Sequence, residues 1–239
     1  MNKIERKAIF NILFFPILFL IIMWMVKLIE YSFLPIENLK DFTRYGVYPQ
    51  NLSGLKGILF SPFIHGEFKH LINNSYPILI LGGMLFFFYK KIAKQLFLWL
   101  FFIAGFWLWI IGGIGNKGLN PHIGASGVIY ALAAFLFISG IIRKNPRLYA
   151  VSMIIIFLYG SMIWGVIPPE VLGGRPTNIS WQGHLAGFMA GIIVAIFYRK
   201  EGPKRKKYQW EIDEELEEKF LKENEFNINY SLKKDDKPN

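Results

Sequence analysis

Long apolar runs without charged residues dominate the first 200 residues of the chain. Each run is about 20 residues long, the length that an α-helix needs to cross the hydrocarbon core of a bilayer. None of the runs contains Asp, Glu, Lys or Arg. The pattern predicts an all-α, polytopic membrane protein: a core of residues 1–200 with a bundle of six transmembrane helices, at 8–26, 71–89, 96–115, 123–142, 148–168 and 181–198.

Lysine and arginine residues gather at alternate ends of these runs. The clusters are Lys3, Arg6 and Lys7; Lys90, Lys91 and Lys94; Arg143, Lys144 and Arg147; and Arg199, Lys200 and Lys204–Lys207. Because basic loops stay on the cytoplasmic side, we expect both termini in the cytoplasm of a plasma-membrane protein. The loops 27–70, 116–122 and 169–180 should then face outward.

Composition narrows the chemistry further. The chain is 53% hydrophobic and contains no cysteine, so disulfides, a thiolate nucleophile and zinc–sulfur sites are excluded. The net charge of +10 would suit a nucleic-acid partner, but its position at the ends of apolar runs indicates membrane orientation instead. We therefore expect a lipid bilayer and no nucleic acid as partner. Residues 201–239 form a charged cytoplasmic tail. Within it, the stretch from Trp210 to Phe226 is expected to be a solvated helix or to lie on the inner leaflet, and the chain is expected to be disordered from Lys233 onward.

Polar residues lie at the start of the second, fourth and sixth runs. Since all three runs begin on the predicted outer side, a rise of about 1.5 Å per residue puts their first turns in one layer, roughly 5–10 Å deep. Polar and ionisable groups at that depth are costly and usually functional. The residues are His70, Asn74, Ser126 and His184.

Ser126 and His184 are candidates for a nucleophile and its base. Ser126 opens a helix between Gly124 and Gly127, where free N–H groups could stabilise an oxyanion; the same motif could instead serve helix packing. His184 could accept the serine proton, or be a structural residue or a metal ligand. Gly183, Gly187 and Gly191 recur at every fourth position, a spacing that lets helices approach closely. The expected partner is the fourth run, which carries Ala131 and Ala134.

No carboxylate lies between Glu67 and Glu170, so a triad acid is not available and a dyad is expected. Tyr130, four residues after Ser126, could stack on the His184 ring. His70 and Asn74 share a helix face and can both donate to an oxyanion. His65 and His70 could also be metal ligands, but a spacing of five suits one helix face poorly, so no metal and no other cofactor is expected.

Three motifs, in order along the chain, resemble those of the rhomboid family of intramembrane serine proteases: His65-x4-His70-x3-Asn74, Gly124-x-Ser126-Gly127-x2-Tyr130 and His184-x2-Gly187-x3-Gly191. The resemblance covers the second to sixth runs and matches the basic six-helix bacterial form. It implies a Ser126–His184 dyad, and an oxyanion hole of His70, Asn74 and the Ser126 N–H. It also implies cleavage of transmembrane protein substrates. One departure is visible: many members carry a Trp-Arg pair in the first outer loop, and the corresponding stretch here is near Lys56-Gly57.

Two other classes of function compete with a protease. A catalytically silent relative would bind membrane-protein clients, but Ser126 and His184 argue against it. A channel would need a polar lining through several runs, and the inner halves of these runs are apolar. We further expect the loop 169–180 to cap the site and the fifth run to gate lateral access, with Tyr159 or Trp164 as a latch.

Overall fold

The computed structural model describes residues 2–32, 42–115, 120–144, 148, 150, 153, 165–168, 171, 180–203 and 209–235, with side chains to residue 224 in the last range. The chain divides into two units, Met1–Pro203 and Lys204–Asn239. Most of the predicted fifth span, the latch residues Tyr159 and Trp164, and most of the predicted cap 169–180 lie outside the described residues.

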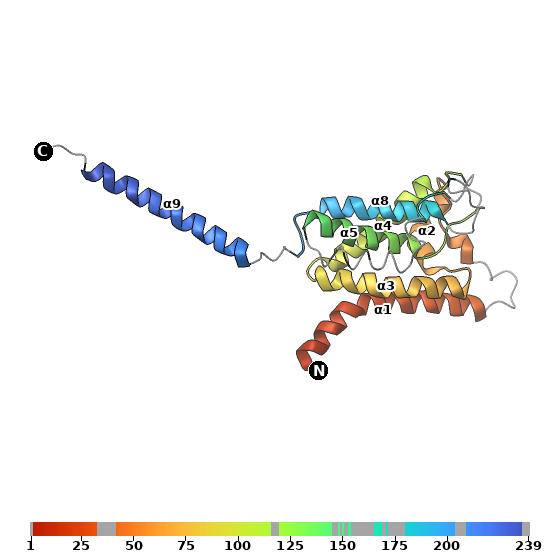
Figure 1. Cartoon of the computed structure of the whole chain (residues 1–239). Helices are drawn as coiled ribbons and strands as arrows, with labels where there is room; N and C mark the ends of the chain where they lie inside the picture. The colour runs from red at the N-terminus through yellow and green to blue at the C-terminus, as the bar shows by residue number, and fades with distance from the viewer. Residues whose placement is uncertain are drawn as a thin grey trace. The chain divides into compact units, whose positions relative to one another are not determined.

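Five long helices lie in the described part of the first unit (Figure 1): α1 (Lys3–Ser32), α3 (Phe68–Phe88), α4 (Ala93–Ile111), α5 (Ser126–Ile142) and α8 (Trp181–Phe197). Short helices connect α1 to α3: η1 (Phe42–Tyr45), η2 (Leu52–Gly54), α2 (Leu55–Phe60) and η3 (Ser61–Phe63). Within the described ranges, the isolated bridge Val47–His122 is the one β-type pairing. The predicted all-α class is therefore confirmed.

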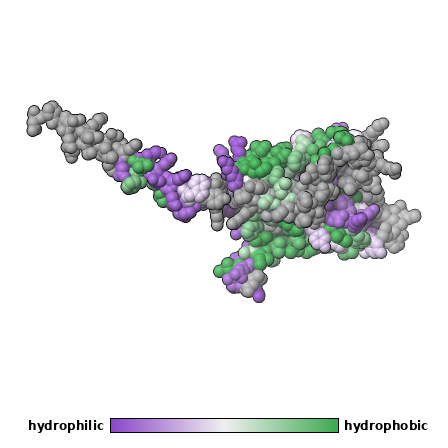
Figure 2. Space-filling model, in the orientation of Figure 1, coloured by the Kyte–Doolittle hydropathy of each residue, from purple (hydrophilic) through white to green (hydrophobic). Residues whose placement is uncertain are grey.

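Membrane-spanning character is clear in α1, α3 and α4, which are long and apolar enough to cross a bilayer, whereas α5 and α8 are apolar helices of 17 residues. Large apolar side chains remain exposed along these helices, including Met25, Tyr76 and Phe106. Figure 2 shows such hydrophobic surface above and below the helical body. This is the surface expected of helices in contact with lipid.

The helix pair α1–α3 is antiparallel. Pro16 packs against Gly82, where an added Cβ would meet the proline ring at 3.0 Å. The Phe15 ring stacks on the Phe86 ring with 5.2 Å between their centroids. Nearer the start of α3, the Trp24 indole N–H donates to Ser75 Oγ at 3.2 Å. α1 is longer than the run 8–26, because its last turns contain Lys27 and Glu30, which a charge-free criterion excludes.

The helix pair α5–α8 is parallel and in close contact. An added Cβ at Gly187 would collide with the Gly127 carbonyl, and one at Gly191 would lie 2.6 Å from both the Ala131 carbonyl oxygen and the Ala134 Cβ. The glycine spacing thus has the packing role that the sequence predicts, with the expected partner helix. Because the helices are parallel, their first residues lie at the same end.

Arg143 joins the other ends of α5 and α8. Its guanidinium donates to the Tyr198 carbonyl at 2.6 Å and to the Arg199 carbonyl at 3.0 Å, and its Nε donates to Ser139 Oγ at 3.1 Å. A cation is favourable at a helix C-terminus, where carbonyl groups lack intrahelical partners. We call this end of the body the basic end, and the opposite one, where α3, α5 and α8 begin, the site end.

The second unit contains α9 (Gln209–Asp235). Good helix formers dominate it, and pairs such as Glu218–Lys222 at 3.8 Å add support along one face. The helix continues through Lys233–Asp235, so the predicted disorder is wrong for these three residues, while residues 236–239 lie outside the described part.

Enlarging Gly191 should separate α5 from α8. We expect Gly191→Val to reduce the free energy of unfolding by about 1–3 kcal/mol, the usual cost of overpacking, measured as a lower Tm of the detergent-solubilised protein. Gly113→Ala is a suitable control, because its Cβ would meet only the Pro49 Cβ at 3.7 Å. Equal losses in both variants would contradict the close-packing account.

Candidate active site

Ser126 is the first residue of α5, and the backbone before it is shaped by Gly124. Gly124 has φ +103°, a conformation that side-chain-bearing residues rarely adopt. An added Cβ there would lie 3.1 Å from His70 Nε2 and 3.7 Å from Asn74 Nδ2. Two side-chain nitrogen atoms from α3 therefore lie near the backbone two residues before Ser126. The first N–H groups of α5, which begins at Ser126, have no partner within the helix.

His184 lies in the first turn of α8 and is held on two sides. The Tyr130 ring stacks on its imidazole, with 4.2 Å between the centroids and 11° between the planes. Nδ1 lies 2.9 Å from the Gly165 carbonyl oxygen. Since a carbonyl only accepts, Nδ1 carries the proton and Nε2 is left with a free lone pair. The predicted Tyr130 stacking is observed; the Gly165 contact was not predicted.

Ser126 and His184 lie on the two helices that the glycine contacts bring together. Gly127 is next to Ser126, and Gly183 is next to His184. A Cβ added to Gly127 would lie 3.2 Å from the carbonyl oxygen of Gly183. Within the described part of the chain no hydrogen bond joins Ser126 to His184. Catalytic hydrogen bonds are often long in free enzymes and tighten when substrate binds.

His65 precedes α3 and fixes the amide of Asn74. The Asn74 Nδ2 donates to His65 Nε2 at 2.9 Å, and the Ala125 backbone N–H contacts the same nitrogen at 3.4 Å. An imidazole nitrogen that accepts is unprotonated, so the His65 proton is on Nδ1. Asn74 is 6% exposed, whereas its neighbour Asn73 faces outward. One amide N–H of Asn74 is thus held by His65, which leaves the other for a ligand.

The charge state of His65 follows from its surroundings. Burial, with a smaller effect of His70 in the same direction, lowers the pKa of His65 from 6.5 to about 3, although the Phe63 backbone acts against this shift. The ring is therefore neutral near pH 7. A neutral ring is required if Nε2 is to accept from Asn74.

His122 is a residue of the site end that the sequence analysis missed. Its Nε2 donates to the Gly112 carbonyl at 3.0 Å, so its Nδ1 accepts from Ser180 Oγ at 2.7 Å. Ser180 caps α8 by accepting from the Gly183 N–H at 3.0 Å. Burial lowers the pKa of His122, and its backbone pairs with Val47. His122 thereby ties the end of α4 to the start of α8, one turn before His184.

A small cavity of about 30 Å³ lies beside Ser126, enough space for a water molecule. Its polar edge comes from Ser61, His122, Ser126 and Ser180, and its apolar wall includes Phe101 and Leu108. Among the described residues, no group of three or more His, Asp or Glu side chains is arranged to hold a metal ion.

Comparison with known proteins gives a consistent picture. A family model described as "Rhomboid domain" matches residues 53–201. Uncharacterized proteins of Mycobacterium tuberculosis and Mycobacterium bovis are each 34% identical over 166 residues, which is 67% of this chain and 65% of theirs. An uncharacterized protein of Mycobacterium leprae is 32% identical over 182 residues, 72% of this chain and 68% of its own. The chain thus spans slightly less than two thirds of the first two relatives.

The depressed pKa of His65 predicts acid sensitivity. The unfolded chain takes up a proton between pH 6.5 and about 3 that the folded protein does not, so this contribution to stability is present above pH 6.5 and is lost as the pH falls toward 3. In His65→Gln, the free energy of unfolding should fall less steeply with acidification, by at most about 1.4 kcal/mol per pH unit. If the free energy of unfolding fell equally steeply with pH in the variant and in wild type between pH 4 and 7, the lowered pKa of His65 would be contradicted.

Proposed function

Because the chain belongs to the rhomboid family, we propose that it is an intramembrane serine endopeptidase that cleaves peptide bonds in or next to transmembrane segments of other membrane proteins. The observation that carries this proposal is the arrangement around the start of α5. There Gly124 is bordered by His70 and Asn74, and Tyr130, one turn after Ser126, stacks on His184. This arrangement supports the assignment of a nucleophile, a base and two oxyanion donors to one end of the body.

The proposed reaction is acyl transfer in two steps. Ser126 Oγ attacks the carbonyl carbon of the scissile peptide while its proton passes to His184 Nε2. The tetrahedral intermediate collapses, the C–N bond breaks, and His184 returns the proton to the leaving amine. Water then attacks the acyl ester with His184 again as base, and Ser126 is regenerated as the acid product leaves.

His184 needs an orienting partner, because the described site end offers no carboxylate beside it. The Gly165 carbonyl takes that part by accepting the Nδ1 proton at 2.9 Å. This bond selects the tautomer whose Nε2 can act as base. The Tyr130 ring limits rotation of the imidazole from the side. The pair of contacts supports a dyad that functions without a triad acid.

The oxyanion hole consists of Asn74, His70 and the Ser126 N–H in this proposal. Donors that are already in place stabilise the developing charge without reorganisation. The bond from Asn74 to His65 supports such preorganisation, since it fixes the plane of the amide. His65 therefore acts through Asn74 and needs no contact with substrate.

We also propose an orientation in the membrane. The basic end carries Lys90, Lys91, Arg143, Lys144 and Arg199, which favours the cytoplasmic side, together with both termini. The site end then opens to the outer face of the plasma membrane. Single-pass or other transmembrane proteins are the expected substrates, because their helices can reach this depth from the bilayer.

Ser126→Ala and His184→Ala should each abolish cleavage of a model transmembrane substrate and labelling by a fluorophosphonate probe. Residues that act as a unit are not additive, so the double variant should lose no more activity than either single variant. Ser53→Ala, at an exposed serine, is the control. A wild-type protein that is neither labelled nor active, although folded and able to bind membrane proteins, would favour the catalytically silent alternative.

Asn74→Ala should lower kcat by on the order of 10²–10³, the usual effect of losing one oxyanion donor, with little change in KM. Asn73→Ala is the matched control, because Asn73 is the exposed neighbour on the same helix. Steady-state kinetics in proteoliposomes distinguish the two. An Asn74→Ala variant with raised KM and unchanged kcat would exclude this residue from the oxyanion hole.

A further inference from the structure

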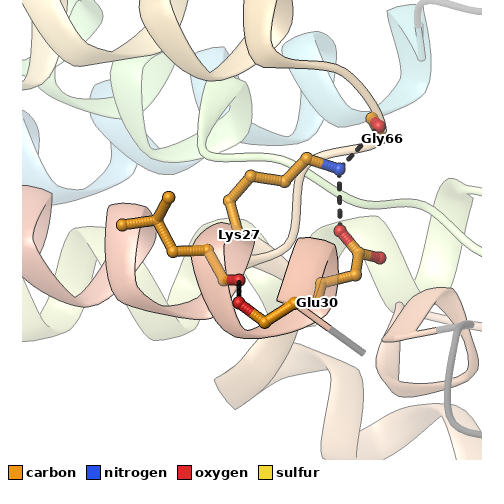
Figure 3. A network of polar contacts seen from close by, with 5 residues as sticks. Lys27, Glu30 and Gly66 are labelled. Atoms are coloured by element: carbon orange, nitrogen blue, oxygen red, sulfur yellow. Dashed lines mark hydrogen bonds and ion pairs between the residues drawn. The ribbon is translucent and has the colours of Figure 1, made fainter. Parts of the chain in front are cut away.

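A buried ion pair lies at the site end of α1, outside the region that the family model matches. Lys27 Nζ is 2.8 Å from Glu30 Oε2, and the two side chains are only 10% and 11% exposed (Figure 3). The removal of two charges from water is costly, and a buried pair is often no more stable than apolar residues of similar size. Stability alone is therefore a weak explanation for this pair.

Lys27 has a second partner, the backbone of the segment that leads into α3. Its Nζ donates to the Gly66 carbonyl oxygen at 2.8 Å, as Figure 3 shows. Glu30 accepts from the same ammonium group and holds it in place. Lys27 also lies 5.6 Å from the centre of the Phe68 ring, in the first turn of α3. The ammonium group thus connects the end of α1 to the start of α3.

Among the described residues, side-chain packing around Gly66 is sparse. Gly66 is exposed, and a Cβ added to it would meet a single atom, Ile123 Cδ1, at 4.0 Å. Yet Gly66 directly follows His65, which is 1% exposed and accepts from Asn74. The Lys27 bond therefore restrains the backbone at Gly66, where side-chain packing is sparse, next to the buried residue that orients the Asn74 amide.

We propose that Lys27 is a positioning residue for the oxyanion hole. Through Gly66 it sets the position of His65, and through His65 it sets the direction of the free Asn74 N–H. The first helix then has a part in catalysis besides anchoring the chain in the bilayer. This inference rests on the proposed function above.

The test uses the full-length protein in detergent and a fluorophosphonate probe, which needs no known substrate. In the labelling reaction an O–P bond forms at Ser126, the P–F bond breaks, fluoride leaves, and the serine proton passes to His184. The oxyanion donors stabilise the charge that develops on the phosphoryl oxygen. The saturating rate constant reports this chemistry, and the half-saturating probe concentration reports binding.

Three variants separate positioning from stability. Lys27→Met removes the bond to Gly66 and leaves Glu30 unpaired. Lys27→Met with Glu30→Met also removes the bond but replaces the pair by apolar side chains, which should restore stability. Phe15→Leu weakens the same helix pair at its basic end, where Phe15 stacks on Phe86, without changing Gly66.

We expect the saturating labelling rate constant to be about tenfold lower than that of wild type in both Lys27 variants. Their half-saturating concentration should stay within about twofold of wild type, and the double variant should recover Tm but not rate. Phe15→Leu should lose Tm but not rate. Recovery of the rate in the double variant, or an equal loss in Phe15→Leu, would overturn the proposal. Absence of labelling in wild type would instead refute the proposed function.

Discussion

Water is scarce at the depth of a transmembrane helix, so the buried polar groups of this protein must satisfy one another. The site end meets this constraint for most of its buried polar groups through three separate sets of hydrogen bonds; among the described residues, His65 Nδ1 is the buried side-chain atom that has no partner. His184 donates to the Gly165 carbonyl, Asn74 donates to His65, and His122 lies between the Gly112 carbonyl and Ser180. Each bond also fixes a tautomer or an amide plane. The same hydrogen bonds therefore satisfy the polar groups and orient them.

The second requirement is a short distance between two helices. Ser126 and His184 come from segments far apart in the sequence, and only small residues between α5 and α8 let their backbones approach. Gly187 against Gly127 and Gly191 against Ala131 supply this contact. Arg143 fixes the same pair at its far end by binding two carbonyl groups of the α8 terminus. The relative depth of Ser126 and His184 is thus set at both ends of the pair.

Much of this could be predicted from residue type and spacing. The all-α class, the close contact through Gly187 and Gly191, and the stacking of Tyr130 on His184 all follow from periodicity and from the helix face that residues share. The Gly165 carbonyl could not be predicted, because every residue has a carbonyl and only the folded backbone shows which one points to His184. His122 was overlooked because it lies in a loop, although its position four residues before Ser126 was a usable signal. Lys27 was overlooked because a charged residue marks the end of a span in a hydropathy pattern, whereas here a nearby carboxylate and a carbonyl keep it buried.

The shortness of α5 and α8 has a consequence for the surrounding lipid. A helix of 17 residues is about 25 Å long, whereas the hydrocarbon core of a bilayer is about 30 Å thick. Arg143, Arg199 and Lys200 favour the headgroup layer at one end, so the missing length falls at the other. A thinner bilayer at that end is one way in which such a mismatch is accommodated, and a hollow in the protein below the lipid surface is another. In the proposed orientation, either response would bring bulk water toward the level of Ser126, and the depth of the hollow would depend on the thickness of the host membrane.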